Sequence, residues 1–190
     1  WAAEGSEMIT RNAGNLLNLV NQILALSKIE SGSLHLRMVQ GDIVSYFGYV
    51  VDAFKGHALA KRIKLHYLSD EEEIIMDYDP EKYMTILSNL LSNAIKFTPE
   101  EGNIYVNLTF RKNAEHSFLE LNVRDTGIGI PQDEIDHIFE RFYQVQNELT
   151  TSGIGTGIGL SLVRELVIML DGEIQVKSAP GKGATFTITL

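Results

Sequence analysis

The stretch Asp125-Thr-Gly-Ile-Gly129 follows a run with strand-like alternation, and a second glycine stretch, Gly153-Ile-Gly-Thr-Gly-Ile-Gly159, precedes a helical pattern. Glycine lets the backbone turn with positive φ and approach a ligand closely. Free N–H groups at the start of a helix bind anions. The two stretches together predict loops around an anionic ligand, although Asp-x-Gly is also common in plain turns.

Two other phosphate-binding motifs do not fit the second stretch. A dinucleotide fingerprint would need a glycine at position 160, which is Leu160, and a preceding strand, whereas a polar loop precedes the stretch here. A P-loop needs Gly-Lys followed by Ser or Thr, but Gly181-Lys182 is followed by Gly183. Both motifs are excluded.

A polar stripe lies upstream, on a helix predicted over residues 80–97. Asn89, Asn93 and Lys96 are spaced i, i+4 and i+7, so their side chains share one helix face. An amide oxygen can ligate a hard cation, and a lysine is a compact counter-charge for phosphate. The stripe is therefore either a solvated face or part of a binding site.

The remaining periodicity predicts a mixture of helices and strands. Asp42 and Asp79 are the expected helix N-caps. Consecutive strands joined as hairpins favour an α+β fold, a two-layer sandwich of a mixed sheet with helices packed on one face. The expected helices cover residues 1–32, 42–60, 80–97, 131–139 and 158–170, and the strands cover 63–68, 74–76, 104–110, 118–123, 173–177 and 185–190.

Composition excludes several classes of protein. The 190 residues carry a net charge of −9, which disfavours a nucleic-acid partner. The absence of cysteine excludes disulfides and thiolate zinc sites. No apolar run reaches the ~18–20 residues that cross a bilayer, so no membrane contact is expected. Because the sequence starts at Trp1 without a methionine, we expect it to be part of a longer protein.

The predicted N-terminal long helix has an apolar seam with 4-3-4-3 spacing, which two arrangements could bury. The helix could pack onto the body of the same domain, or it could form the dimer interface of a helical bundle. Spacing alone leaves both open. The seam consists of Ile9, Ala13, Leu16, Val20 and Ile23.

Taken in order, the motifs resemble those of the catalytic ATP-binding domain of sensor histidine kinases. They are Asn-x-x-x-Asn-Ala-x-Lys-Phe-Thr-Pro, Asp-x-Gly-x-Gly, Phe-x-x-Phe, Gly-x-Gly-x-Gly-Leu and Gly-x-Gly-Ala-Thr-Phe. That domain belongs to a superfamily shared with DNA gyrase, a heat-shock chaperone and mismatch-repair ATPases. The resemblance implies a Bergerat-type ATP-binding domain over residues 42–190, a linker over 33–41, and over 1–32 the second helix of a dimerisation and phosphoacceptor hairpin.

The resemblance also assigns roles to residues. Asn93 would coordinate Mg²⁺, Lys96 would contact the phosphates of ATP, and Asn89 would line the same cavity. Asp125 would accept a hydrogen bond from the adenine amino group. The other positions implied to bind the nucleotide are Gly127, Gly129, Phe139, Phe142, Gly155, Gly157, Gly159, Leu160 and Thr185.

Several of these positions have a second interpretation. Phe139 and Phe142 would anchor a lid formed by residues 143–156, or they could simply be core residues. Thr185 would support the adenine, or it could be an ordinary strand residue. Gly129 would give the base room, while Gly155, Gly157, Gly159 and Leu160 would close on the phosphates.

Three departures narrow the expected chemistry. The ATP-hydrolysing relatives have a water-activating glutamate where this chain has Asn89, and an amide cannot act as a base. An arginine that family members often carry after the aromatic box is Gln144 here, and Arg141 lies three residues earlier. No histidine has the context of the family's phosphoacceptor, so the chain is expected to begin after that helix; the histidines are His35, His57, His66, His116 and His137.

The resemblance therefore implies a protein-histidine kinase module of two-component signalling. It would bind Mg-ATP and transfer the γ-phosphoryl group to a histidine of the dimerisation helix. A response regulator receiver domain and a second copy of the protein are the implied partners, in the cytoplasmic portion of a membrane-bound sensor. The alternative is a nucleotide-sensing dimerisation and interaction module without phosphotransfer.

Overall fold

A computed structural model describes residues 2–112, 117–145 and 155–190. Its helices are α1 (Ala2–Glu30), α2 (Ile43–Ala60), α3 (Pro80–Phe97) and α4 (Gly159–Met169). Its strands are β1 (Val39–Asp42), β2 (Lys64–Ser69), β3 (Ile75–Tyr78), β4 (Asn103–Lys112), β5 (Ser117–Asp125), β6 (Glu173–Ser178) and β7 (Ala184–Thr189). Residue 1, residues 113–116 and residues 146–154 lie outside the described residues, and with them His116, Gly153 and most of the expected lid.

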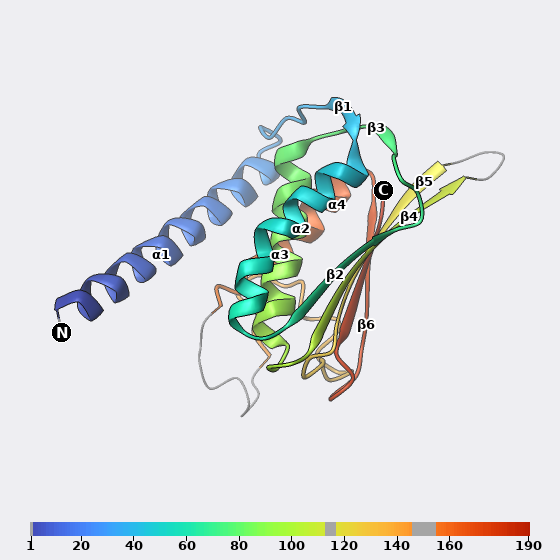
Figure 1. Cartoon of the computed structure of the whole chain (residues 1–190). Coiled ribbons are helices and arrows are strands. Elements are labelled where there is room, and N and C mark those ends of the chain that lie inside the picture. Colours follow the sequence, from blue (N-terminus) through green and yellow to red (C-terminus); the bar gives the residue numbers. More distant parts are fainter. Residues whose placement is uncertain (1, 113–116, 146–154) are drawn as a thin grey trace.

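A five-stranded sheet in the order β2-β4-β5-β7-β6 forms one layer, and α2, α3 and α4 form the other (Figure 1). β2 pairs with β4 in parallel, and the other pairs in this sheet are antiparallel. The expected α+β fold, with helices on one face of a mixed sheet, is confirmed.

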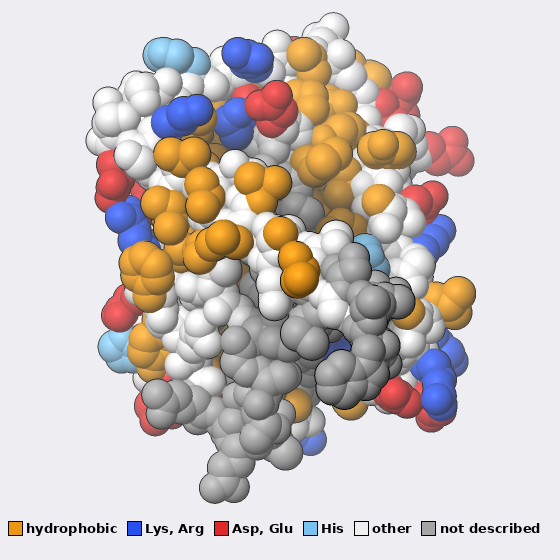
Figure 2. Space-filling view, turned by 90° about the vertical axis from the view of Figure 1, so that its left-hand side faces the viewer, with side chains coloured by type: hydrophobic (Ala, Val, Ile, Leu, Met, Phe, Trp, Pro, Cys, Tyr) orange, Lys and Arg blue, Asp and Glu red, His pale blue; other side chains and the backbone are white. Residues whose placement is uncertain are grey.

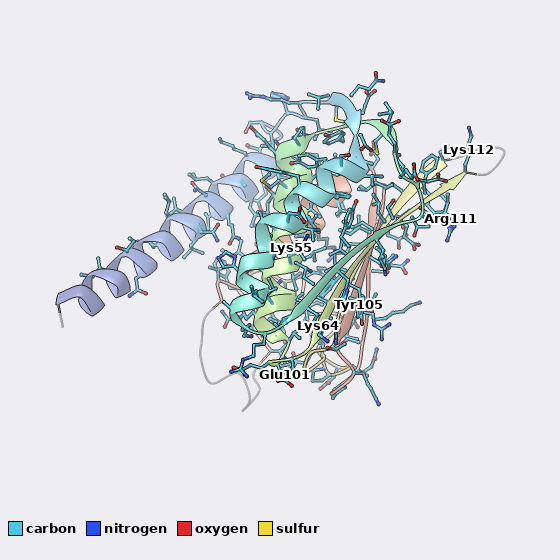
Figure 3. All side chains as sticks on the ribbon, viewed as in Figure 1. Lys55, Lys64, Glu101, Tyr105, Arg111 and Lys112 are labelled. Carbon is cyan, nitrogen blue, oxygen red and sulfur yellow. The ribbon has the colours of Figure 1, made fainter. Side chains whose placement is uncertain are left out.

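The strand register decides which side chains face the helices. Val106, Val123 and Phe186 lie opposite one another and are buried in the core. Their strand neighbours Tyr105 and Arg124 lie on the other face, where Tyr105 stacks on the ring of His66 at 4.7 Å (Figure 3). Side chains therefore alternate between core and solvent along each strand.

Helix α3 is fixed at both ends. Asp79 is the N-cap, as expected, and its carboxylate accepts from the backbone N–H groups of Glu81 and Lys82. At the other end the ammonium of Lys61 donates to the carbonyl oxygens of residues 95, 96 and 98 at 2.7, 2.9 and 3.1 Å. These contacts satisfy terminal backbone groups that a helix leaves unpaired and hold the polar stripe of α3 in place.

Burial of Asp79 would raise the pKa of its carboxyl. The backbone N–H groups of Arg37 and Lys82, together with the charge of Lys82, outweigh this burial and lower the pKa below its ordinary value. The cap therefore stays ionised at neutral pH.

One element prediction is wrong. Residues 131–139 do not form a helix: the backbone bonds from Glu134 to Pro131 and from His137 to Glu134 close successive i→i+3 turns. Ile130 before the segment bonds to Ser178, and Phe142 after it bonds to Gly157. These two contacts fix where the segment begins and ends, and they outweigh its local preference for a helix. Residues 39–41, which the sequence assigns to a linker, are part of β1, which pairs antiparallel with β3; the domain boundary itself stays a prediction.

Helix α1 projects from the body, and only its C-terminal third is packed against it (Figure 1). Leu26 is buried there, whereas Ile9 is 70% exposed and Leu16 is 62% exposed. Apolar side chains gather on the side from which α1 projects (Figure 2). The interpretation in which the seam packs onto the body of its own domain is therefore wrong for this part of the helix. Within the described residues, no helix is long and apolar enough to cross a bilayer.

Candidate functional site

Asp125 ends β5 on the helix-covered face of the sheet and is only 6% exposed. Its Oδ1 atom accepts from the N–H of Gly127 at 2.7 Å and from the N–H of Ala184 at 3.3 Å. Burial raises the pKa of this carboxyl, and the two N–H groups oppose that rise. Both bonds within the described residues use Oδ1, so Oδ2 is available to accept a bond from a ligand.

The loop between β6 and β7 passes very close to Asp125. Gly183 has φ of +74°, and a Cβ added there would lie 2.0 Å from the carbonyl oxygen of Asp125. Gly181 has nearly the same φ, +72°, but a Cβ added to it would meet nothing within 4 Å. The two glycines therefore separate the cost of the backbone angle from the cost of the close approach.

We expect Gly183→Ala to destabilise the fold by at least about 2 kcal/mol more than Gly181→Ala. Both variants place alanine in the left-handed backbone conformation, which costs ~1–2 kcal/mol. Only Gly183→Ala also forces the loop away from the backbone of Asp125. Free energies of unfolding in denaturant measure both costs. Equal costs would show that the loop does not pack against Asp125 as described.

The glycine stretches both adjoin α3. A Cβ added to Gly127 would lie 2.5 Å from the carbonyl oxygen of Phe97, at the C-terminal end of the helix. A Cβ added to Gly155 would lie 2.8 Å from Nζ of Lys96, and one added to Gly159 would lie 2.6 Å from Oδ1 of Asn89. The two glycine stretches, which are far apart in the sequence, thus both lie against α3, and the second stretch lies beside its polar stripe.

The polar stripe of α3 combines the two amides of Asn89 and Asn93 with one cation, Lys96. Lys96 lies 4.6 Å from the centroid of the Phe97 ring, and burial lowers the pKa of its ammonium. A bound phosphate would oppose that shift, because a nearby opposite charge favours the charged form.

Asn93 is half-buried on the same stripe, and its side chain makes no hydrogen bond within the described residues. Its amide oxygen is a suitable ligand for Mg²⁺. The described part of the chain has no cluster of three or more His, Cys, Asp or Glu side chains that could hold a metal. This donor set fits an ion that one protein oxygen and substrate phosphates share, since Mg²⁺ sites usually combine few protein ligands with substrate phosphates rather than an all-protein cage.

The two phenylalanines of the expected aromatic box lie in different environments. Phe139 is half-buried and meets Phe186 edge-on at 6.5 Å, so its ring is part of the core. The side chain of Phe142 is 66% exposed, so this residue contacts the second glycine stretch through its backbone. Its N–H donates to the carbonyl of Gly157 at 2.8 Å, and a Cβ added to Gly157 would lie 2.6 Å from the carbonyl carbon of Phe142.

The ends of the expected lid are described, although residues 146–154 are not. The Nε2 atom of Gln144 donates to the carbonyl of Gly155 at 2.8 Å, so this side chain ties the two ends together. Leu160, on the first turn of α4, is half-buried against the core.

Two expected contributions differ in the structure. Thr185 pairs with Arg124 on the face of the sheet opposite Asp125, so its side chain does not reach the site, and Ala184 lies beside Asp125 instead. A Cβ added to Gly129 would lie 2.0 Å from the carbonyl oxygen of Ala179, so packing between two loops already requires a glycine there.

The structure adds two residues that sequence reasoning missed. Gln22 of α1 donates to Oδ1 of Asn89 at 3.2 Å and accepts from the hydroxyl of Thr156 at 3.1 Å. No spacing rule links residues so far apart in the chain. The only sequence signal is a polar side chain beside an apolar seam.

Residues 78–190 match the family described as histidine kinase-, DNA gyrase B- and HSP90-like ATPase. The chain is 41% identical over 187 residues to the sensor histidine kinase TmoS of Ectopseudomonas mendocina, an alignment covering 97% of this chain and 18% of TmoS. It is 33% identical to the sensor histidine kinase WalK of Bacillus subtilis, with 96% and 30% covered. The chain thus spans less than a third of the length of either relative.

Solved structures share the fold. Full-length ShkA in complex with AMPPNP matches 98% of this chain and 38% of its own, with a TM-score of 0.81 and 28% identity. Histidine kinase ThkA in complex with the response regulator TrrA matches 96% of this chain and 49% of its own, with a TM-score of 0.71 and 22% identity.

Proposed function

Because the chain belongs to the histidine kinase-, DNA gyrase B- and HSP90-like ATPase family, we propose that it binds Mg-ATP between α3 and the two glycine stretches. We further propose that it transfers the γ-phosphoryl group to a histidine of a dimerisation helix. The observation that carries the proposal is the meeting of both glycine stretches on α3, beside Asn89 and Lys96.

Each group has a role that its environment supports. Asp125 is held by Gly127 and Ala184, so its free oxygen is aimed and can accept from the adenine amino group. Lys96 places a positive charge beside Gly155, where phosphates would lie. Asn93 would hold Mg²⁺, which when bound neutralises charge on the phosphates.

Transfer to an external nucleophile fits this site better than hydrolysis. Asn89 occupies the position of the water-activating glutamate, and its amide cannot take a proton from water. Phosphoryl transfer itself depends mainly on positioning and charge neutralisation, which the residues around α3 can supply. The alternative function, a nucleotide-sensing module without phosphotransfer, is favoured by Gln144 in place of an arginine, since the γ-phosphate then has one fewer cation.

The proposed partners follow from α1 and from the relatives. The exposed seam of α1 would be buried by pairing with other helices of a dimerisation hairpin in a homodimer. ThkA was solved with a response regulator, so we propose that a receiver domain then accepts the phosphoryl group from that histidine. By the resemblance to sensor kinases, we also propose that this part of the protein acts on the cytoplasmic side of a membrane-bound sensor.

Incubation of the chain with radiolabelled Mg-ATP and a separate two-helix hairpin bearing a phosphoacceptor histidine tests the transfer. We expect an acid-labile, alkali-stable label on the hairpin. The control hairpin, with that histidine replaced by glutamine, should remain unlabelled. ATP binding without label on either hairpin would favour the nucleotide-sensing module, and steady release of phosphate at ordinary enzyme rates would favour an ATPase.

A further inference from the structure

Gln22 of α1 connects this helix to both sides of the proposed nucleotide site. Its side chain is 9% exposed, although α1 is otherwise mostly exposed. Its Nε2 donates to Asn89 on α3, and its Oε1 accepts from Thr156, next to Gly155 and Gly157. One amide therefore bridges the polar stripe of α3 and the second glycine stretch.

The bridge occupies polar groups that border the proposed nucleotide site: Asn89 lines the proposed cavity, and Thr156 lies between two glycines proposed to close on the phosphates. The Oδ1 atom of Asn89 accepts from Gln22, while its Nδ2 donates to the carbonyl of Thr85 at 2.7 Å. The hydroxyl oxygen of Thr156 also accepts from the N–H of Ile158 at 3.3 Å, just before α4 begins. N–H groups at a helix start are the donors that phosphates bind. In this network, therefore, the polar groups of Asn89 and Thr156 form hydrogen bonds with other groups of the protein and not with a ligand.

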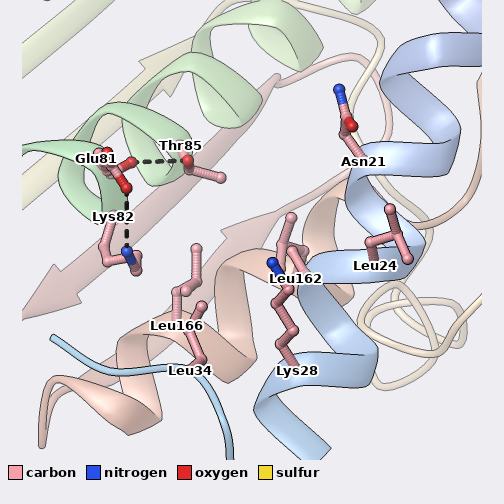
Figure 4. Close-up of a pocket in the computed structure, with 10 residues that line it drawn as sticks. Asn21, Leu24, Lys28, Leu34, Glu81, Lys82, Thr85, Leu162 and Leu166 are labelled. Atoms are coloured by element: carbon pink, nitrogen blue, oxygen red, sulfur yellow. Dashed lines mark hydrogen bonds and ion pairs between the residues drawn. The ribbon is translucent and has the colours of Figure 1, made fainter.

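The rest of the contact between α1 and the body combines apolar packing around buried Leu26 with an exposed ion pair. Glu30 and Arg141 form an exposed ion pair at 2.5 Å, and such pairs contribute little. A pocket of about 250 Å³ separates α1 from α3 and α4, and it is lined by residues such as Asn21, Lys28 and Thr85 (Figure 4). Gln22 itself is buried and does not line this pocket, so its two hydrogen bonds add a specific polar contact to the apolar packing of Leu26.

We propose that Gln22 is a positioning residue that makes docking of α1 and binding of nucleotide compete. This proposal rests on the proposed ATP site. Docked α1 holds Asn89 and Thr156 in the self-satisfied arrangement and lowers nucleotide affinity. Bound nucleotide breaks the bridge and loosens α1. The coupling acts in both directions with equal size, as linkage requires.

The variant Gln22→Met tests the competition, because methionine keeps the length and helix propensity of glutamine but makes neither hydrogen bond. Calorimetric titration with Mg-AMPPNP should give a dissociation constant at least about threefold lower than that of the unaltered chain, because one net hydrogen bond corresponds to about threefold to tenfold and the variant removes both bonds of the bridge. The control Asn18→Met makes the same kind of change at an exposed position of α1 and should leave the constant unchanged.

The reciprocal effect separates coupling from a merely structural role. Hydrogen exchange of the α1 amides at residues 19–30 should accelerate when Mg-AMPPNP is added to the unaltered chain, and should not change further in Gln22→Met. Equal or weaker nucleotide affinity in Gln22→Met, or no response of α1 to nucleotide, would overturn the competition while the ATP site stands. If neither protein binds nucleotide, the proposed function fails and the competition fails with it.

Discussion

Replacing Asp125 with asparagine lowers the affinity for ATP by about a hundredfold, ~2.7 kcal/mol, and leaves the fold intact. The Oδ1 atom of the asparagine can still accept from the N–H groups of Gly127 and Ala184, so the local structure keeps its bonds. The other side-chain atom becomes an NH₂ group, which places one donor against the adenine amino group. A buried donor facing a donor loses the bond and leaves both groups unsatisfied.

Calorimetric titration of ATP into both proteins measures this loss, and circular dichroism verifies the fold. Asp136→Asn is the matched control, because Asp136 is exposed in the turn segment that follows the first glycine stretch. An Asp125→Asn variant with the affinity of the unaltered chain would remove Asp125 from the adenine-binding role.

We expect that replacing Asn93 with alanine removes the dependence of ATP binding on Mg²⁺. The half-buried amide of Asn93 is the protein oxygen that we assign to the ion, and the described residues contain no acidic cluster to replace it. Without that ligand the ion can still associate with the phosphates of ATP in solution, but it no longer links them to the protein.

Titrations with excess Mg²⁺ and with a chelator give the ratio of the two dissociation constants. We expect a ratio near one for Asn93→Ala and a ratio well above one for the unaltered chain and for Ser92→Ala, whose side chain is exposed on the same helix. If Mg²⁺ tightened ATP binding equally in all three proteins, the metal role of Asn93 would be wrong.

The sequence predicts the parts of the fold that local chemistry determines. Asp42 and Asp79 are N-caps as expected, because their carboxylates bond to N–H groups two or three residues away. The α3 stripe with Asn89, Asn93 and Lys96 follows from helical spacing alone.

The wrong predictions depend on contacts that local chemistry does not determine. Residues 131–139 have apolar spacing suited to a helix, but contacts of Ile130 with Ser178 and of Phe142 with Gly157 fix the ends of the segment. The motif alone predicts Thr185 near the adenine, whereas a one-residue step along a strand moves a side chain to the other face of the sheet. The bridge from Gln22 to Asn89 joins residues 67 positions apart, so only the folded chain reveals it.

Amide chemical shifts during titration with Mg-ATP test the central claim most directly, since they report binding and its location together. We predict saturable shifts at Gly127, Gly155, Gly159 and Ala184, which surround the proposed site, and none at Asn107, on the open face of the sheet. Shifts confined to the open face, or no shifts at millimolar ATP, would contradict the proposal that ATP binds between α3 and the two glycine stretches.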